Sequence, residues 1–430
     1  MSVAVLGGGL TGLVSAYLLS KKGFSVEVFE RDGFLGGIAA PFPFEGTHLD
    51  RFYRHIYVCD CALLSLIDEL GLGAKLGWHK SRMGFYSGGA CYDFGGPLDL
   101  LRFHPLSFAE RFRFGLITLY LGFVKDSTRF DTVSADEWLT KYMGKHGYET
   151  VWAHLLKSKF GDDYKSVPLS WFWSKIQLRK SNRTKTMSNE KLGYLDGSFK
   201  VLVDALADAI IGSGSVIHTG APVEKLIVEG GRAVGLMVSG REFRFDRILS
   251  TLALPELAKL IPDSELDYRD SLLRIGHKGI VVMVLKLKRG LSPYYWLSIG
   301  DSTIPFNLLL EHTNLVSLDK YNGKHILYVS NYTSTDDSLY KLEGEELLEE
   351  YLPHLRKVYH GFKREDVEEV FVYRSDYGTP VFMKGYRNLI PSHKSPLENL
   401  YLACGEQIYP EDRGMSKSIE VAGKVVDLMV

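Results

Sequence analysis

A glycine-rich segment near the N-terminus constrains the fold of this chain more than any other feature. Residues 7–12 read Gly-Gly-Gly-Leu-Thr-Gly and satisfy the pattern G-x-G-x-x-G. A short apolar run at 3–6 precedes them, a helical pattern at 13–22 follows, and a second apolar run occupies 26–30. This order predicts a βαβ unit whose first turn binds a dinucleotide.

The individual residues of this turn have separate roles. Gly7 makes the tight turn, Gly9 lets the backbone approach a pyrophosphate, and Gly12 lets the helix pack against the sheet. The N-terminus of the helix supplies positive charge for the phosphates. Glu30 ends the second strand, about 20 residues beyond the glycines, where an acidic side chain binds ribose hydroxyls.

Two further segments favour FAD over NAD as the cofactor. Gly36-Gly37 follows the acidic residue and lets the backbone press against a diphosphate. Near the C-terminus, Gly414-Met415 opens the last helix, whose N-terminus would stabilise charge on a reduced flavin ring. Because the sequence has only one such fingerprint, we expect electrons to pass between substrate, FAD and oxygen, a quinone or another carrier.

These motifs resemble the superfamily of FAD-dependent amine oxidases, protoporphyrinogen oxidases and phytoene desaturases. The resemblance covers essentially the whole chain and is strongest at both ends. The motifs and the resemblance together place the cofactor contacts at Gly7, Gly9, Leu10, Thr11, Gly12, Glu30, Arg31, Gly36, Gly37, Ile38, Val223, Gly405, Glu406, Gly414 and Met415.

The resemblance also implies particular roles for some of these residues. Val223 would hold the adenine through its backbone, Glu406 would bind the ribityl-diphosphate region, and the amide of Met415 would face the isoalloxazine ring. Ile38 and Ala39 stand where the family has an arginine and a hydroxyl residue.

The pattern along the chain predicts an α/β fold with two interleaved domains. The first and last segments both contain short apolar strands that are followed by a helix. The middle of the chain mixes helical periodicity with alternating strands. We expect a discontinuous Rossmann-type FAD-binding domain at 1–95, 190–260 and 395–430. An α+β substrate domain, with a mixed sheet and a helical subdomain, would occupy 96–189 and 261–394.

Lys278 and His55 are the candidates for catalysis. The strand around Lys278 resembles the amine oxidase strand whose lysine holds a water against flavin N5, although a solvated lysine is an alternative. His55 would lie near the flavin, or serve as a hydrogen-bonded structural histidine. The sequence shows no metal-ligand spacing, Ser-His-Asp signature or catalytic carboxylate pair, so we expect no metal.

Aromatic residues offer a wall for a substrate tunnel, with ordinary core packing as the alternative. They are Tyr294, Tyr295, Trp296, Tyr328 and Tyr332.

Two segments suggest contacts with other molecules. The stretch 103–124 has the composition of an amphipathic membrane-surface helix, although a helical subdomain packed on its own domain is preferred. A basic loop with Arg179, Lys180, Arg183 and Lys185 would bind anionic headgroups or a nucleotide sugar, or remain solvated.

Composition excludes other classes of protein. The 430 residues include 51 Lys and Arg and 52 Asp and Glu, a formal net charge of −1. Such a balance gives no global electrostatic reason to bind nucleic acid. The most membrane-like stretch, 115–124, is half the length of about 20 residues needed to span a bilayer. We expect a cytoplasmic protein, with peripheral membrane contact and the oligomeric state left open.

The leading functional hypothesis is oxidation or desaturation of a hydrophobic or amine-bearing small molecule by hydride transfer to flavin N5. A redox-neutral flavoenzyme of the UDP-galactopyranose mutase type, acting on a nucleotide sugar, is the rival. A flavin fold kept as a carrier or assembly partner is a third, non-enzymatic alternative.

Overall fold

A parallel sheet near the N-terminus carries the predicted nucleotide-binding turn. The computed structural model describes residues 1–182 and 191–430. The five strands follow the order β10 (Val216–His218), β2 (Ser25–Phe29), β1 (Ser2–Leu6), β14 (Arg247–Ser250) and β20 (Leu400–Leu402). All four pairings between them are parallel.

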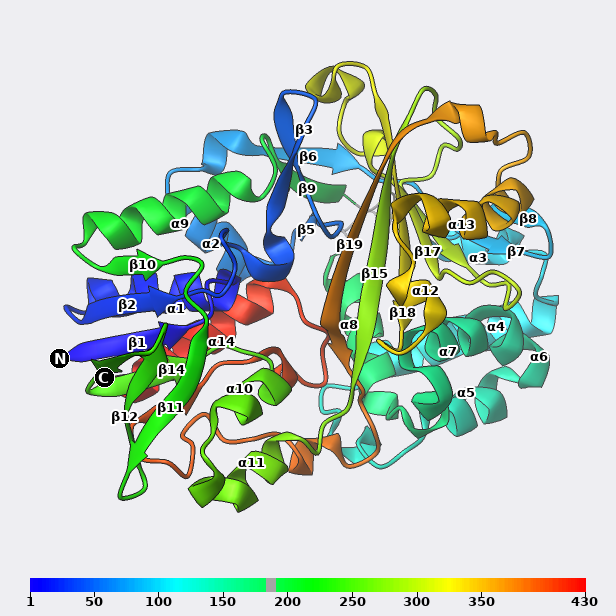
Figure 1. Cartoon of the computed structure of the whole chain (residues 1–430). Coiled ribbons are helices and arrows are strands. Elements are labelled where there is room, and N and C mark those ends of the chain that lie inside the picture. The colour runs from blue at the N-terminus through cyan, green and yellow to red at the C-terminus, as the bar shows by residue number, and fades with distance from the viewer. Residues whose placement is uncertain (183–190) are drawn as a thin grey trace.

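The alternation of side chains along β1 assigns each face of this sheet to a different layer. Val3 and Val5 belong to the buried cluster formed with α1 (Leu10–Lys21), α9 (Lys200–Gly212) and α14 (Met415–Met429). Ala4 and Leu6 belong to the cluster formed with a three-stranded antiparallel sheet on the other face. That sheet contains β11 (Val223–Glu229), β12 (Arg232–Val238) and β13 (Arg241–Arg244). Figure 1 shows this sandwich on the left, with both chain termini.

A mixed sheet of seven strands forms the second large layer. Only β16 and β7 pair in parallel, and all other neighbours are antiparallel. The order is β19 (Val367–Pro380), β15 (His277–Leu287), β18 (His325–Thr333), β17 (Leu308–Glu311), β16 (Trp296–Ile299), β7 (Met83–Ser87) and β8 (Ala90–Asp93). Helices α12 (Ser338–Lys341) and α13 (Gly344–Val358) lie on it, and the long strands β15 and β19 cross the middle of the molecule (Figure 1).

A bundle of helices lies beside the seven-stranded sheet (Figure 1). Its members are α3 (Pro97–Arg102), α4 (Phe108–Phe123), α5 (Ala135–Met143), α6 (Lys145–Tyr148), α7 (His154–Phe160) and α8 (Leu169–Ser181). Leu121, Leu139 and Phe160 are fully buried within it.

Smaller elements join these layers. The hairpin of β3 (Pro41–Phe44) and β4 (Thr47–Asp50) and the three-stranded sheet of β5 (Ile56–Tyr57), β9 (Lys191–Leu195) and β6 (Leu76–Lys80) lie between the two large sheets (Figure 1). The remaining helices are α2 (Cys61–Glu69), α10 (Leu254–Leu260) and α11 (Leu266–Leu272).

The predicted fold class is confirmed, because a parallel nucleotide-binding sheet is interleaved with a mixed sheet and a helical subdomain. The division into two domains stays a proposal. The pairing of β7 with β16 places 83–93 in the mixed sheet, although the proposed division assigns these residues to the FAD-binding domain.

Candidate FAD and substrate site

The turn between β1 and α1 has the geometry of a phosphate cradle. Gly7 adopts φ +99°, and a Cβ atom on Gly12 would lie 1.9 Å from the carbonyl oxygen of Gly7. Only glycine therefore fits at position 12. Gly9 caps α1 without a side-chain hydrogen bond, and the nearest atom to a Cβ there would be the Cα of Gly37 at 4.0 Å. The first turn of a helix lacks internal acceptors for its amides, so the amides of Leu10 and Thr11 are suited to bind an anion.

The second glycine pair packs directly on this turn. The Gly36 amide donates to the Gly8 carbonyl at 2.9 Å, and Gly9 and Gly36 form a parallel bridge. A Cβ on Gly37 would lie 3.2 Å from the Cα of Gly9. The structure thus brings together two glycine segments that sequence reasoning assigned to the same diphosphate.

Glu30 lies at the rim of the cradle. Its carboxylate accepts from the amides of Gly8 at 2.7 Å and Asp32 at 2.9 Å, and the side chain is buried. The Glu30 carbonyl accepts from Ala221 at 2.8 Å, which brings the segment before Val223 to the same edge. Arg31 is exposed, and its guanidinium contacts Glu256 at 3.3 Å.

The C-terminal segment reaches the cradle from the other side. Leu10 of α1 and Met415, the first residue of α14, belong to one buried cluster, and Gly414 caps α14. The Glu406 carboxylate is used internally, because it accepts from His277 at 2.8 Å and from the Leu254 amide at 2.9 Å. Burial raises the pKa of Glu406, but these two donors outweigh burial and leave the pKa below its ordinary value.

A Cβ on the preceding residue, Gly405, would lie 2.5 Å from Cδ of Arg413. Glycine at 405 therefore makes room for Arg413, which itself lines the cavity described next.

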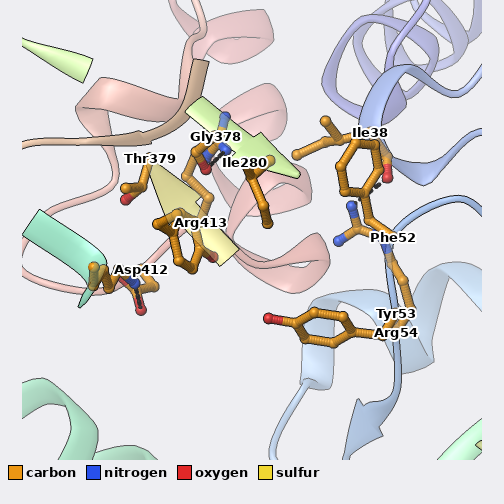
Figure 2. A pocket seen from close by; sticks show the side chains of 11 residues that line it. Ile38, Phe52, Tyr53, Arg54, Ile280, Gly378, Thr379, Asp412 and Arg413 are labelled. Carbon is orange, nitrogen blue, oxygen red and sulfur yellow. Dashed lines mark hydrogen bonds and ion pairs between the residues drawn. The ribbon is translucent and has the colours of Figure 1, made fainter. Parts of the chain in front are cut away.

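A cavity of about 170 Å³ opens beyond the double glycine, between the cradle and the seven-stranded sheet. Figure 2 shows Ile38 and Arg54 on one side of it and Ile280 and Thr379 on the other. Its lining consists of Ile38, Phe52, Tyr53, Arg54, Lys159, Ile280, Tyr332, Gly378, Thr379, Asp412 and Arg413.

Asp412 anchors a partly buried charge cluster at the edge of this cavity, where its side chain is 27% exposed and those of Lys159 and Lys175 are 13% and 24% exposed. Its carboxylate accepts from Lys159 at 2.6 Å, from the Trp171 indole at 2.9 Å, and from Lys175. Burial raises the pKa of Asp412, but the two lysines outweigh it and hold the pKa well below its usual range. Burial lowers the pKa of Lys175 to about 8, although Asp412 opposes the shift.

Two arginines make the cavity electropositive. Arg54 donates to the Ile38 carbonyl at 2.5 Å, and its buried Nε has no hydrogen-bond partner among the described residues. Arg413 donates to the Gly378 carbonyl. With Lys159, three cations line the cavity and face one carboxylate, Asp412.

The two predicted catalytic residues do not line this cavity. Lys278 pairs with Thr379 in the sheet, but its Nζ lies 2.8 Å from the position of a Cβ on Gly161 and therefore packs over the end of α7. His55 contacts the Tyr295 hydroxyl through Nδ1 at 3.0 Å, and burial lowers its pKa to about 4, with Arg54 adding to the shift. Their roles in catalysis stay predictions.

The predicted aromatic wall is divided between several environments. Tyr332 lines the cavity, whereas Tyr328 donates to the Asp50 carbonyl at 2.8 Å and Trp296 packs against Tyr53. Tyr294 packs against Arg82 in another buried cluster.

The end of the predicted basic loop is only partly described. Arg179 and Lys180 lie in the last turn of α8 and not in a loop, while Arg183 and Lys185 lie outside the described residues.

Sequence reasoning missed Lys159, Lys175 and Asp412. The lysines belong to helices without a recognisable motif, and Asp412 lies in the loop before α14. Their contacts span more than 230 residues of sequence, so no local pattern could have indicated them.

A family model, described as flavin containing amine oxidoreductase, matches residues 10–408. The chain belongs to this family. FAD is its cofactor, in agreement with the prediction, and the cradle of Gly9, Gly12 and Gly37 has the shape that a dinucleotide requires. The family is one of flavin-containing oxidoreductases.

Two curated proteins are similar in sequence over part of their length. A 4,4'-diapolycopen-4-al dehydrogenase from Metabacillus indicus is 26% identical over 298 residues, which cover 63% of this chain and 59% of that protein. Protoporphyrinogen oxidase 2, chloroplastic/mitochondrial, from Arabidopsis thaliana is 31% identical over 153 residues, covering 35% of this chain and 30% of that protein.

Two solved structures share the fold across the chain. A putative protoporphyrinogen oxidase from Exiguobacterium sp. 255-15 superposes with a TM-score of 0.77 at 17% identity, covering 100% of this chain and 98% of that one. A reduced UDP-galactopyranose mutase gives a TM-score of 0.74 at 16% identity, covering 99% and 96%. At these identities the likeness concerns the fold alone.

Proposed function

We propose that this protein is an FAD-dependent oxidoreductase that oxidises or desaturates a hydrophobic or amine-bearing small molecule. The cavity carries the proposal, because it lies immediately beyond Gly37 and combines apolar walls with a few fixed polar groups. When bound, FAD supplies a hydride acceptor at N5. Oxygen, a quinone or another carrier would take the electrons in turn.

The residues that would hold the cofactor form a continuous path. The first amides of α1, with Gly9 and Gly37, would bind the diphosphate, and Glu30 would bind the ribose. Val223 would hold the adenine. The start of α14 at Met415 would face the flavin ring, where the positive end of the helix stabilises negative charge.

The charges around the cavity favour a hydrophobic substrate over an amine. A protonated amine would meet Arg54, Lys159 and Arg413, while the Asp412 carboxylate already accepts three hydrogen bonds. Phe52, Tyr53, Ile280, Ile38 and Tyr332 offer apolar surface to an uncharged chain or ring.

Lys159 is the group best placed to influence the chemistry from this chain. Its ammonium lines the cavity, is held by Asp412 and lies 5.4 Å from the centre of the Tyr332 ring. A fixed cation there would stabilise negative charge that develops on a reacting molecule and would hold a proton at Nζ for transfer. Lys278 and His55 remain candidates for a similar role.

The cytoplasmic location expected from the sequence is part of the same proposal.

Anaerobic mixing of the FAD-loaded protein with candidate substrates tests this function. Polyprenoids and porphyrinogens should bleach the flavin absorbance, whereas primary amines should leave it unchanged. Bleaching by amines alone would contradict the preference for an uncharged substrate. Bleaching by none of these compounds would contradict the proposed substrate class.

The redox-neutral rival has one observation in its favour. The arginines and lysine that line the cavity would also suit the diphosphate of a nucleotide sugar. Isomerisation of a nucleotide sugar that requires dithionite-reduced flavin, with no net oxidation, would select this function over the oxidative one.

A further inference from the structure

The outer face of α4 presents large apolar side chains to solvent. Phe108, Phe112 and Phe123 are 72%, 61% and 77% exposed. Leu116, Leu119 and Tyr120 on the same helix are also exposed. In a soluble protein such a continuous apolar surface marks a contact with another molecule.

Helical geometry places these six side chains on one face. Their spacing of three and four residues follows the 3.6-residue turn of an α-helix. Ile117 and Leu121 point the opposite way and are buried against the helical subdomain. One face of this helix therefore packs on its own domain, which is one of the two alternatives expected for 103–124, and the other face is exposed to solvent.

The neighbouring helix α3 extends the apolar face. Leu98 and Leu101 are 68% and 55% exposed. The sixteen residues of α4 span about 24 Å, at 1.5 Å per residue. Across residues 1–182 and 191–430, none of the helices has the length and apolar character needed to cross a membrane. Because the exposed side chains run along the length of α4, a contact made by this face would lie along a surface.

The charges around the apolar face are mainly positive. Arg102, Arg113, Lys125, Arg129 and Lys180 are exposed on α3, α4, the segment after α4, and the end of α8. Lys180 also lies 5.5 Å from the centre of the Phe123 ring.

The three acidic residues of α3, α4 and the segment 124–130 are used in local hydrogen bonds. Asp99 accepts from the Gly95 and Gly96 amides, and Asp126 accepts from the Thr128 amide. Glu110 accepts from Ser107 and contacts His146. Five exposed cations against these three carboxylates leave the region of the apolar face with an excess of positive charge, on a chain whose net charge is only −1.

We propose that this face of α3 and α4, which we call the α4 face, docks on the headgroup layer of a bilayer that contains anionic lipids. The phenylalanines and leucines would enter the boundary between headgroups and acyl chains, and the surrounding cations would pair with lipid phosphates. A second copy of this chain fits less well, because a symmetric contact would bring the same cations together.

Docking of the α4 face on a bilayer is consistent with a hydrophobic substrate, but the residues that support it are not those that line the cavity. Helix α8 joins the two sites, since Gln177 donates to the Leu121 carbonyl of α4 while Trp171 and Lys175 bind Asp412 at the cavity. The α4 face and the cavity are therefore connected through one helix.

Vesicle sedimentation of the full-length, FAD-loaded protein tests the α4 face. The protein should bind vesicles of phosphatidylcholine mixed with phosphatidylglycerol, and bind less with phosphatidylcholine alone or in high salt. The double variant Phe108→Ser/Phe112→Ser should bind about tenfold or more weakly, because two large apolar side chains are lost. The matched control Ile211→Ser/Leu273→Ser removes two exposed apolar side chains elsewhere and should bind like the parent.

Several results would overturn the proposal. Equal vesicle binding by the parent and the Phe108/Phe112 variant would remove the face from the contact. Failure of the parent to bind, together with a concentration-dependent dimer that the same variant abolishes in sedimentation velocity, would assign the face to a second copy. Retained flavin absorbance in both variants shows that the fold is intact, so a negative result here leaves the proposed oxidation untouched.

Discussion

Replacing Asp412 by Asn tests the energetics of the charge cluster beside the cavity. The substitution keeps the size of the side chain but removes the charge that two lysines share. Removing one partner of a hydrogen-bonded buried charge typically costs about 1–3 kcal/mol, because the remaining group is left without compensation. The side chains of this cluster are only partly buried, so at neutral pH we expect Asp412→Asn to lower the free energy of unfolding by no more than about that amount.

The direction in which the free energy of unfolding changes with pH follows from the pKa of Lys175. Burial lowers the pKa of Lys175 to about 8, so the unfolded chain holds this proton more tightly than the folded chain. Stability from this group therefore rises with pH between about 8 and the ordinary lysine value near 10.4. Loss of Asp412 removes an interaction that supports the charged lysine, so in Asp412→Asn this rise should begin at lower pH.

Chemical denaturation at several pH values, at saturating FAD, measures both effects. The double variant Asp412→Asn/Lys175→Met is the informative control, because it removes an uncompensated charge together with its former partner. It should be more stable than Asp412→Asn at neutral pH. A single variant as stable as the parent, or a double variant no more stable than the single one, would refute this reasoning.

Three further predictions concern the cradle, a buried histidine and the two lysines. Gly12→Ala should abolish FAD retention, measured by flavin absorbance, and lower the free energy of unfolding by about 1–3 kcal/mol, since its Cβ would collide with the Gly7 carbonyl. The control Gly423→Ala, where space is open, should retain FAD. Burial lowers the pKa of His312 to about 3, so this group makes stability fall as pH drops from 6.5; thermal midpoints of His312→Asn should fall less over that range, and an unchanged slope would count against this. In stopped-flow reduction with an active substrate, Lys159→Met should slow flavin reduction about 100-fold and Lys278→Met should slow it less. The reverse order would favour Lys278 over Lys159 as the catalytic lysine.

The cradle could be predicted from sequence because its determinants are local. Gly7, Gly9 and Gly12 lie within one turn, and their order between a strand and a helix specifies both the backbone geometry and the ligand. The approach of Gly36 and Gly37 to this turn was also predictable, since a βαβ unit returns the chain to the same edge of the sheet.

The cavity could not be predicted in the same way because its residues come from distant segments. Lys159 and Asp412 meet only when the helical subdomain packs against the loop before α14. For Lys278 the strand could be predicted, but the direction of the side chain could not. The pairing of this strand with β19 has an irregular register between Lys278 and Ile280. Sequence periodicity gives the strand and not the local break.

The visible absorption spectrum of the purified protein, with identification of the cofactor released on denaturation, tests the central claim most directly. The account predicts flavin absorbance bands and the release of FAD. A colourless protein that added FAD cannot reconstitute would contradict the assignment of the glycine cradle as a cofactor site, and the proposed oxidation would fall with it.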